Sequence, residues 1–356
     1  MSFAKRCFFA FSFGSLLLIY CSSPLKKQVD SLFSIYAGKN VPGAALLIIK
    51  DGKPLLKKCY GMADVERQIP VTEQTNFRLA SVTKQFTAMC IMMLEERGKL
   101  SYDQPLTDIF PNFPEYGRKI TIRHLLNHTS GLIDYESLIP DTATSQVLDK
   151  DVLQMMMSQD STYFPPGSQY RYSNSGYAVL AIIVEQVSGQ RFAQFLKENI
   201  FEPLGMNTTV AFEQGVSEVS HRAYGYANED GQLIPKDQSL TSAVLGDGGI
   251  YSSIEDLFKW DQALYTERLV RTETLHQAFT PGVLNDGTKL DYGFGWRIDS
   301  YRGVMRQHHT GQSCGFATII QRYPEQNFSI IILTNRNEPM LNQTADQLAD
   351  WFLFGR

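Results

Sequence analysis

Apolar and polar residues follow different periods at the two ends of the chain and in its middle. Near the N-terminus, residues 25–37 have apolar positions at helical spacing, and residues 44–50 and 54–60 are typical of two strands joined by an Asp-Gly turn. Near the C-terminus, short apolar runs predict strands and an apolar-faced stretch predicts a closing helix. These elements are residues 292–298, 303–309, 316–323 and 328–334 for the strands and 341–354 for the helix.

The pattern predicts an α+β fold. The two chain ends supply an antiparallel sheet flanked by helices, and the middle is mainly helical and loop-rich. We expect one catalytic domain over residues 25–354, with a sheet lobe of about residues 25–75 and 290–354 and a mostly helical lobe of about residues 76–289. No low-complexity tract, internal repeat or Pro/Ser/Gly-rich linker divides it.

Composition excludes few function classes. The 356 residues are 43% hydrophobic and 20% charged, with a formal net charge of -4, which is typical of a globular protein. Because there is no block of lysine and arginine, this charge balance argues against a nucleic-acid partner. If Cys21 is lipidated, the remaining thiols are Cys59, Cys90 and Cys314, and they do not indicate a disulfide framework.

Residues 1–21 are typical of a signal peptide. Lys5 and Arg6 precede an apolar run over residues 7–20, which is short for a bilayer span. The residues around Cys21 resemble a bacterial lipoprotein signal, although Tyr20 is larger than the small residue usual before that cysteine. We expect an exported protein, either periplasmic or attached to the membrane through lipidated Cys21. Plain cleavage and an uncleaved anchor are the alternatives.

Three polar clusters could together form a serine acyl-transfer site, and the first is Ser81 with Lys84. Ser81 begins a predicted helix that is apolar nearly all round and ends near Gly98. A spacing of three residues places both side chains on one face of the first turn. Burial there disfavours the ammonium of Lys84 and makes its amine a base for the Ser81 hydroxyl. The alternative is that Ser81 only caps the helix and Lys84 extends to water.

The second and third clusters are Tyr172 with Asn174, and His309 with Thr310 and Gly311. Tyr172 and Asn174 follow a Pro-Pro-Gly turn on an extended segment, which places a phenol and a carboxamide on the same side. A phenol near an amine can relay protons, and a carboxamide can orient a substrate amide and the lysine. His309 and Thr310 come at the end of a predicted strand and could bind a substrate carboxylate. Gly311 would let a substrate backbone approach closely.

With all three clusters assembled, the chain resembles the serine β-lactamase and penicillin-binding-protein superfamily, in particular the class C β-lactamase and D-Ala-D-Ala carboxypeptidase branch. The resemblance runs from about Val41 to Asn335. Supporting segments lie at residues 121–132, 164–168, 246–257 and 333–335. The resemblance implies a β-lactamase/transpeptidase-like fold and chemistry without a metal or other cofactor.

The resemblance also implies a role for each matched residue. Ser81 looks like the acylated nucleophile, Lys84 like its activating amine, and Tyr172 like the shuttle that protonates the leaving group and later activates water. The implied substrate-binding residues are Asn174, which positions the amide, and the third element His309, Thr310 and Gly311. The implied oxyanion hole consists of the backbone N–H groups of Ser81 and Gln312.

Two positions depart from the family pattern. His309 stands where many β-lactamases carry lysine, which lowers the expectation of strong β-lactamase activity. Because histidine ordinarily has a pKa of about 6.5, we expect anionic substrates to bind better toward mildly acidic pH. Gln312 is bulkier than the small residue common in relatives, so we expect a narrower substrate range.

Two further motifs do not support a site. Residues 311–315 match the G-x-S-x-G nucleophile elbow, but every histidine precedes Ser313 and the residues that follow predict a strand instead of a helix. His124 and His128 have i,i+4 spacing but lack the glutamate of a zinc helix, and a turn interrupts any helix there. We expect no metal site, and we expect these two histidines to brace a loop.

The sequence therefore predicts an exported serine hydrolase that forms an acyl-enzyme at Ser81 on a peptide amide, ester or lactam. It is most like a D-Ala-D-Ala carboxypeptidase or an esterase-type homologue of β-lactamases. The alternatives are a true β-lactamase and a non-catalytic protein that binds penicillin or a cell-wall partner. The expected partner is a small molecule or a cell-wall peptide.

Overall fold

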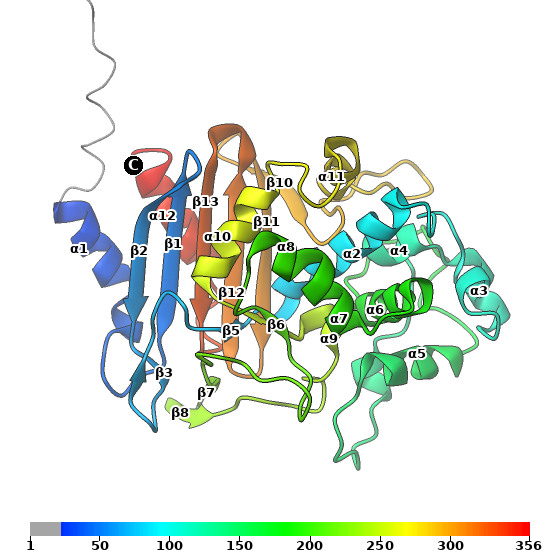
Figure 1. The fold of residues 1–356 in the computed structure, drawn as a ribbon, viewed down its shortest axis with the longest axis horizontal. Helices are drawn as coiled ribbons and strands as arrows, with labels where there is room; N and C mark the ends of the chain where they lie inside the picture. The colour runs from blue at the N-terminus through cyan, green and yellow to red at the C-terminus, as the bar shows by residue number, and fades with distance from the viewer. Residues whose placement is uncertain (1–22) are drawn as a thin grey trace, which may run out of the picture.

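The computed structural model describes residues 23–356, so the predicted leader and Cys21 lie outside the described residues. Its central feature is a six-stranded antiparallel sheet with the strand order β10-β11-β12-β13-β1-β2 (Figure 1). The strands are β1 (Ala44–Lys50), β2 (Lys53–Tyr60), β10 (Arg297–Tyr301), β11 (Val304–Ser313), β12 (Phe316–Tyr323) and β13 (Phe328–Thr334). Because β1 pairs with β13 along its whole length, the two chain ends form one sheet, as predicted.

Helices cover both faces of the sheet. Successive residues of β1 point to opposite faces, so Leu46 packs into the core shared with α1 (Ser23–Leu32) and α12 (Asn342–Phe352), whereas Leu47 packs into the other core. In that second core, α10 (Ile254–Ala263) contacts β1 and β13. Most of the buried residues of α2 (Lys84–Glu96) also belong to this core. Every residue of β12 and β13 is buried, so both faces of these central strands are covered.

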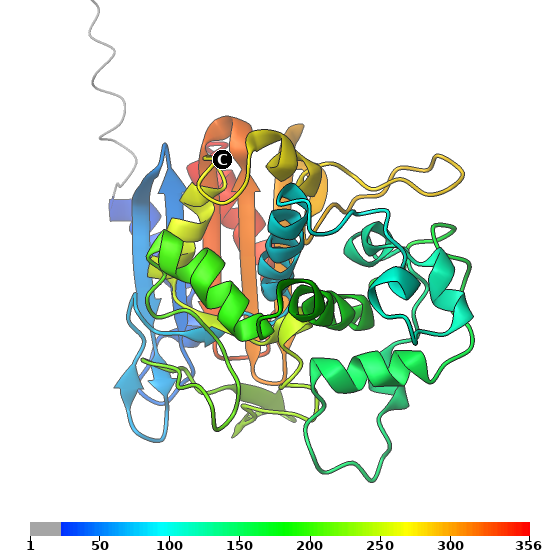
Figure 2. The same cartoon turned by 45° about the vertical axis from the view of Figure 1, so that its right-hand side comes forward.

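A mostly helical region lies to the right of the sheet in Figure 1, and Figure 2 brings it forward. There α6 (Asn174–Ser188) contacts α2, α5 (Asp149–Met157) and α9 (Leu245–Gly248). The other helices are α3 (Leu106–Ile109), α4 (Ile122–Leu126), α7 (Phe192–Leu196), α8 (Glu202–Leu204) and α11 (Thr272–Ala278). The short strands are β3 (Met62–Asp64), β4 (Ile69–Pro70), β5 (Phe77–Arg78), β6 (Val210–Ala211), β7 (Tyr226–Glu229), β8 (Gln232–Pro235) and β9 (Ile250–Ser252).

Two predicted strand boundaries are wrong. The strand predicted over residues 292–298 starts only with β10, because the glycine-rich segment before it packs against α2. A Cβ at Gly295 would lie 2.8 Å from the carbonyl oxygen of Lys84. The strand predicted to end at His309 continues to Ser313 as β11. The third polar cluster therefore lies inside a strand and not at its end.

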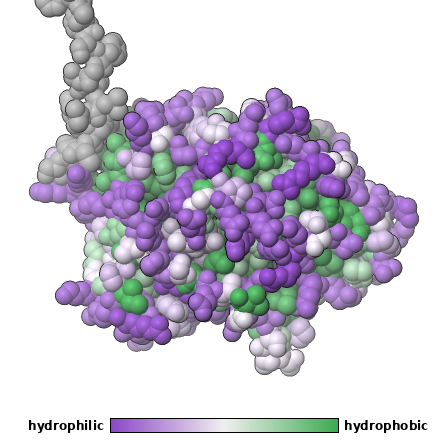
Figure 3. All heavy atoms as spheres, in the orientation of Figure 1, coloured by the Kyte–Doolittle hydropathy of each residue, from purple (hydrophilic) through white to green (hydrophobic). Residues whose placement is uncertain are grey.

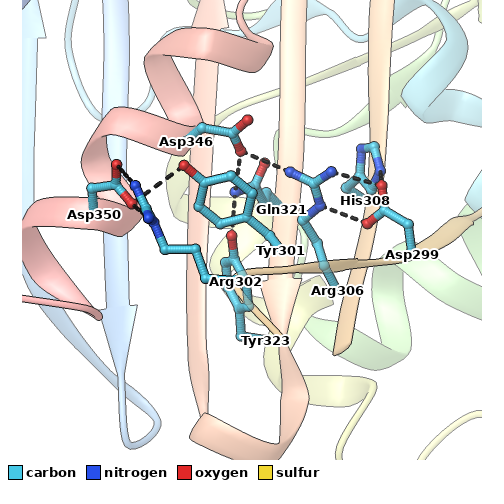
Figure 4. Close-up of polar contacts among 9 residues, drawn as sticks. All are labelled: Asp299, Tyr301, Arg302, Arg306, His308, Gln321, Tyr323, Asp346 and Asp350. Carbon is cyan, nitrogen blue, oxygen red and sulfur yellow. Dashed lines mark hydrogen bonds and ion pairs between the residues drawn. The ribbon is translucent and has the colours of Figure 1, made fainter. Parts of the chain in front are cut away.

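A network of charged side chains joins α12 to the β10–β11 hairpin (Figure 4). Arg306 donates to both Asp299 and Asp346, at N–O distances of 2.7 Å. Arg302 donates to Asp350, one turn further along α12, at 2.7 Å. Each arginine of this network has a carboxylate partner, and the pairs hold the C-terminal helix to the edge of the sheet.

The face of the molecule drawn in Figure 3 is mostly hydrophilic, with apolar side chains scattered between polar ones. Val216 and Val283, the most exposed large apolar side chains of the described chain, lie in different loops. Single exposed apolar residues are usual on a protein surface. From residue 23 to residue 356, no helix combines the length and apolar character needed to cross a membrane.

Candidate active site

Ser81 lies on a short turn between β5 and α2. The turn is a 3-10 helix over Ala80–Thr83, and Ala80 has a φ of +48°, a left-handed conformation that alanine rarely adopts. Strained backbone of this kind clusters at functional sites. Ser81 does not cap α2, because that helix begins at Lys84 with Thr83 at its N-cap. The purely structural interpretation of the serine is therefore wrong.

Lys84 is fully buried behind Ser81. Its Nζ lies 3.2 Å from the Ser81 Oγ, 2.8 Å from the Asn174 Oδ1 and 2.9 Å from the Asp247 carbonyl oxygen. These partners are a hydroxyl and two uncharged carbonyl oxygens, and no ion pair of the described chain includes Lys84. The alternative in which Lys84 extends to water is excluded.

Asn174 is the first residue of α6, and its carboxamide is held from two sides. The Oδ1 accepts from Lys84, and the Nδ2 donates to the Glu136 Oε1 at 2.7 Å. Ser173 caps the helix by accepting from the Gly176 N–H at 3.2 Å. The cap places Asn174 at the helix start. The hydrogen bond to Glu136 orients the carboxamide so that the Asn174 Oδ1 faces Lys84.

Tyr172 lies near Lys84 on the extended segment before α6. The Lys84 Nζ is 5.0 Å from the centroid of the Tyr172 ring. This ring packs on the His128 ring with centroids 4.3 Å apart and lies 6.0 Å from the ring of His309. The Tyr172 hydroxyl is buried and has no hydrogen-bond partner among the described residues. The phenol therefore makes no polar contact with the described chain.

His309 does not present a cation to a substrate. Its Nδ1 lies 2.7 Å from the Thr310 carbonyl oxygen, and its Nε2 lies 2.9 Å from the Tyr292 hydroxyl. Because a carbonyl oxygen can only accept, Nδ1 carries the proton and Nε2 accepts from Tyr292. Burial holds the pKa of His309 well below its ordinary value. The expectation that His309 becomes charged at mildly acidic pH and binds a carboxylate is wrong.

Gly311 makes room for the chain itself and not for a substrate. A Cβ at this position would lie 2.1 Å from the Leu79 carbonyl oxygen and 2.4 Å from the Thr318 Oγ1. The glycine therefore lets β11 pack closely against the segment that leads to Ser81. This contact corrects the role predicted for Gly311.

β11 has an edge without a neighbouring strand beside the nucleophile. β10 pairs with β11 only as far as His308, and residues 309–313 pair with β12 alone. These residues contact the turn that carries Ser81. Thr310 is half-buried and Gln312 is exposed on this part of the strand.

The three predicted clusters meet at one small pocket of about 80 Å³, although Tyr172 and Thr310 do not line it. Ser81 of the first cluster, Asn174 of the second and Gln312, which follows the third, line this pocket. The two residues predicted to supply oxyanion donors, Ser81 and Gln312, are therefore both at its wall. Lys84 and His309 are buried behind that wall.

Several residues of the pocket were not predicted from the sequence. Glu136 and Asp247 line it, and Tyr135 donates to the Asp247 Oδ2 at 3.0 Å. Burial raises the pKa of Asp247 to about 6. The available signal for Asp247 was a carboxylate between glycines at residues 246–249, whereas Glu136 and Tyr292 belong to no motif.

The two histidines with zinc-like spacing brace the backbone, as predicted. The Thr121 N–H donates to the His124 Nδ1 at 3.1 Å, and the Ser173 N–H donates to the His128 Nδ1 at 3.1 Å. In the part of the chain that the structure describes, no group of His, Cys, Asp and Glu side chains is arranged to hold a metal. Ser313 of the elbow-like motif ends strand β11 and is followed by β12, not by a helix.

Known proteins have similar sequences and folds. A family model described as Beta-lactamase matches residues 29–351. The chain belongs to the Beta-lactamase family. It is 35% identical over 347 residues to penicillin-binding protein 4* of Bacillus subtilis (strain 168), an alignment that covers 93% of this chain and 76% of that relative.

Solved structures agree with the Beta-lactamase assignment. The octameric penicillin-binding protein homologue from Pyrococcus abyssi has a TM-score of 0.80 at 27% identity, covering 94% of this chain and 76% of that one. The D-amino acid amidase from Ochrobactrum anthropi SV3 has a TM-score of 0.77 at 24% identity, covering 93% and 98%, and shares the fold. The predicted superfamily and its β-lactamase/transpeptidase-like α+β fold are confirmed, and the chain is related to serine hydrolases and penicillin-binding proteins.

Proposed function

We propose that the protein is a serine hydrolase that forms an acyl-enzyme at Ser81 on a peptide amide, ester or lactam. One observation carries the proposal: the buried Lys84 Nζ lies 3.2 Å from the Ser81 Oγ, and its other partners are uncharged oxygens. A neutral amine has two N–H donors and one lone pair. Asn174 and Asp247 accept the two N–H groups, which leaves the lone pair to accept the Ser81 proton.

In the acylation step, the Ser81 hydroxyl gives its proton to the Lys84 Nζ as its Oγ bonds to the substrate carbonyl carbon. The carbonyl oxygen becomes an oxyanion, and the N–H groups of Ser81 and Gln312 stabilise it. One such donor is worth about 3 to 4 kcal/mol in the transition state. When the intermediate collapses, the bond to the leaving group breaks. The Tyr172 hydroxyl protonates that group and regains a proton from Lys84.

In the deacylation step, water attacks the acyl carbon and Ser81 is released. Tyr172 and Lys84 take the proton from the attacking water and return it to the Ser81 oxygen. The buried Tyr172 hydroxyl supports this role, because no described residue bonds it and its ring lies 5.0 Å from the Lys84 Nζ.

The free edge of β11 supports a peptide-like substrate. An extended chain can add to residues 309–313 through backbone hydrogen bonds. A substrate carboxylate would meet no cation at His309, because both ring nitrogens are already bonded and the ring is neutral. We therefore favour amides and esters over lactams as the substrates that turn over.

A second candidate function is penicillin binding with slow or no turnover at the same serine. The similarity to penicillin-binding protein 4* supports it. A true β-lactamase is a third candidate within the same acylation chemistry. The three differ in how fast water releases the acyl group from Ser81.

We also propose that residues 1–21 direct export and that Cys21 is the point of lipid attachment. The basic residues and apolar run before the cysteine support this. Metabolic labelling with a radioactive fatty acid should modify the wild type and not Cys21→Ser. Labelling of both proteins would contradict attachment at this residue.

Covalent probes test the proposed nucleophile. We expect a fluorophosphonate and a fluorescent penicillin to label the wild type and Ser313→Ala, and neither to label Ser81→Ala. Ser313 is the matched control, because it lines the same pocket. Stable penicillin labelling without hydrolysis indicates a peptidase or penicillin-binding protein, fast lactam hydrolysis a β-lactamase, and p-nitrophenyl ester turnover alone an esterase. Equal labelling of Ser81→Ala would refute the proposal.

A further inference from the structure

We propose that His128 is a positioning residue for Tyr172. This inference rests on the function proposed above, in which Tyr172 carries protons at the Ser81 site. His128 lies in the turn after α4, is fully buried and has a φ of +59°. A residue other than glycine keeps such a left-handed conformation only where its surroundings hold it. The contacts of His128 therefore identify what holds it in this conformation.

His128 bonds the backbone on both sides of Tyr172. The Arg171 N–H donates to the His128 carbonyl oxygen at 3.0 Å, and the Ser173 N–H donates to the His128 Nδ1 at 3.1 Å. The His128 ring also packs on the Tyr172 ring, with centroids 4.3 Å apart. We call these three contacts the His128 clamp. They hold the chain before the phenol, the phenol ring itself, and the chain after it.

The clamp matters because no described polar group holds the Tyr172 hydroxyl. That hydroxyl is buried without a hydrogen-bond partner in residues 23–356, so its place relative to Lys84 depends on backbone position and ring packing. Ser173 also caps α6 and precedes Asn174, whose Oδ1 accepts from Lys84. The clamp therefore sets the position of the phenol relative to the amine, whereas the Asn174 carboxamide is held separately by Lys84 and Glu136.

The clamp requires an uncharged His128. Because Nδ1 accepts from Ser173, the one proton of the neutral ring is on Nε2, which is buried and has no partner among the described residues. Protonation would turn Nδ1 into a donor that faces the Ser173 N–H. Burial keeps the pKa of His128 well below its ordinary value, which is consistent with a neutral ring.

Three variants separate positioning from general stability. His128→Leu removes the ring acceptor, whereas His128→Asn offers an amide oxygen as acceptor and tolerates a positive φ. His124→Leu is the matched control. Its Nδ1 also accepts a backbone N–H, that of Thr121 at 3.1 Å, but His124 makes no such bond to the residues beside Tyr172. If His128→Leu does not fold, His128→Gly removes the same acceptor and relieves the backbone strain.

Hydrogen exchange and acylation kinetics are the two measurements. In His128→Leu we expect amide exchange at Arg171 and Ser173 to accelerate, and Ser81 acylation by an acyl p-nitroanilide, whose amine leaving group must be protonated, to fall about 100-fold, as a displacement of a catalytic group by about 1 Å can cause. His128→Asn should recover most of the rate. His124→Leu should change the melting temperature without changing the rate. In a Tyr172→Phe background, His128→Leu should cost little more, because its effect passes through the missing phenol.

Unchanged exchange at both amides in His128→Leu would overturn the clamp. So would an equal loss of rate from His128→Leu with and without the Tyr172 hydroxyl, since that is the behaviour of a purely structural residue. A wild-type protein that is never acylated at Ser81 would refute the proposed function. The exchange measurement would then still decide whether His128 holds the segment around Tyr172.

Discussion

The Lys84 pocket and the arginine network under α12 surround their basic side chains with opposite kinds of partner. In the network, Arg306 and Arg302 both have carboxylate partners (Figure 4). In the pocket, the partners of Lys84 are one hydroxyl and two uncharged oxygens. A carboxylate favours the charged form of its partner, whereas burial without one favours the neutral form. The comparison indicates why one cluster stabilises the fold and the other is suited to proton transfer.

The same contrast separates two neighbouring histidines of β11. His308 lies 3.3 Å from Asp299 in the network, and His309 bonds Tyr292 on the side of the pocket. Successive residues of a strand point to opposite faces, so the two rings lie in different surroundings. The face of the sheet, and not the residue type, decides whether a histidine has a carboxylate partner.

A carboxylate partner for Lys84 should have the largest effect. Asn174→Asp places an anion where the Oδ1 now accepts from Lys84 at 2.8 Å. The ion pair would hold Lys84 as an ammonium, and we expect Ser81 acylation to fall about 100-fold or more, measured by stopped-flow kinetics with an ester. Asn174→Ala, which removes the carboxamide without adding charge, is the control and should lose less. Acylation of Asn174→Asp at the wild-type rate would show that an unpaired amine is not required.

The converse change in the network should affect stability and not chemistry. Arg306→Met leaves Asp299 and Asp346 without their arginine, and we expect the free energy of unfolding in urea to fall by about 2 kcal/mol. Arg302→Met removes a more exposed pair and should cost less than about 1 kcal/mol. Both variants should acylate at the wild-type rate. A slower rate in a stable Arg306→Met protein would mean that the two regions are coupled.

The neutral state of His309 predicts a smaller effect, on substrate binding. Because its pKa lies well below the ordinary value, we expect the KM of a carboxylate-bearing ester to stay flat between about pH 5.5 and 8. Tyr292→Phe removes the hydroxyl bonded to the His309 Nε2 and supplies no acceptor for a second ring proton, so the KM for the anionic ester should stay flat in this variant as well. A matched uncharged ester is the control and should show the same flat KM. A wild-type KM that falls at acidic pH would restore the charged-histidine interpretation.

Features that depend on local pattern could be predicted from the sequence. β12 and β13 are mostly apolar runs between turns, and residues 316–323 and 328–334 have the predicted bounds. The three-residue spacing brings Ser81 and Lys84 together, although Ser81 lies in the 3-10 turn before α2 and not in the helix itself.

Features that depend on a distant segment could not be predicted. A glycine is needed at position 311 because the Leu79 carbonyl oxygen leaves no room for a Cβ. His309 is neutral because it is buried and bonded to Tyr292. Glu136, which orients the Asn174 carboxamide, lies in a segment that carries no motif. Each of these contacts joins segments that only the tertiary fold brings together, so residue types at the site were predicted better than their partners.

The most direct test of the central claim is the single-turnover rate of Ser81 acylation in the wild type and in Lys84→Met. Mass spectrometry of the peptide that contains Ser81 follows the covalent adduct over time. We predict an adduct on this peptide in the wild type and a rate about 1000-fold lower in a folded Lys84→Met protein. An adduct that forms at the wild-type rate without the amine, or that forms on another peptide, would contradict activation of Ser81 by Lys84.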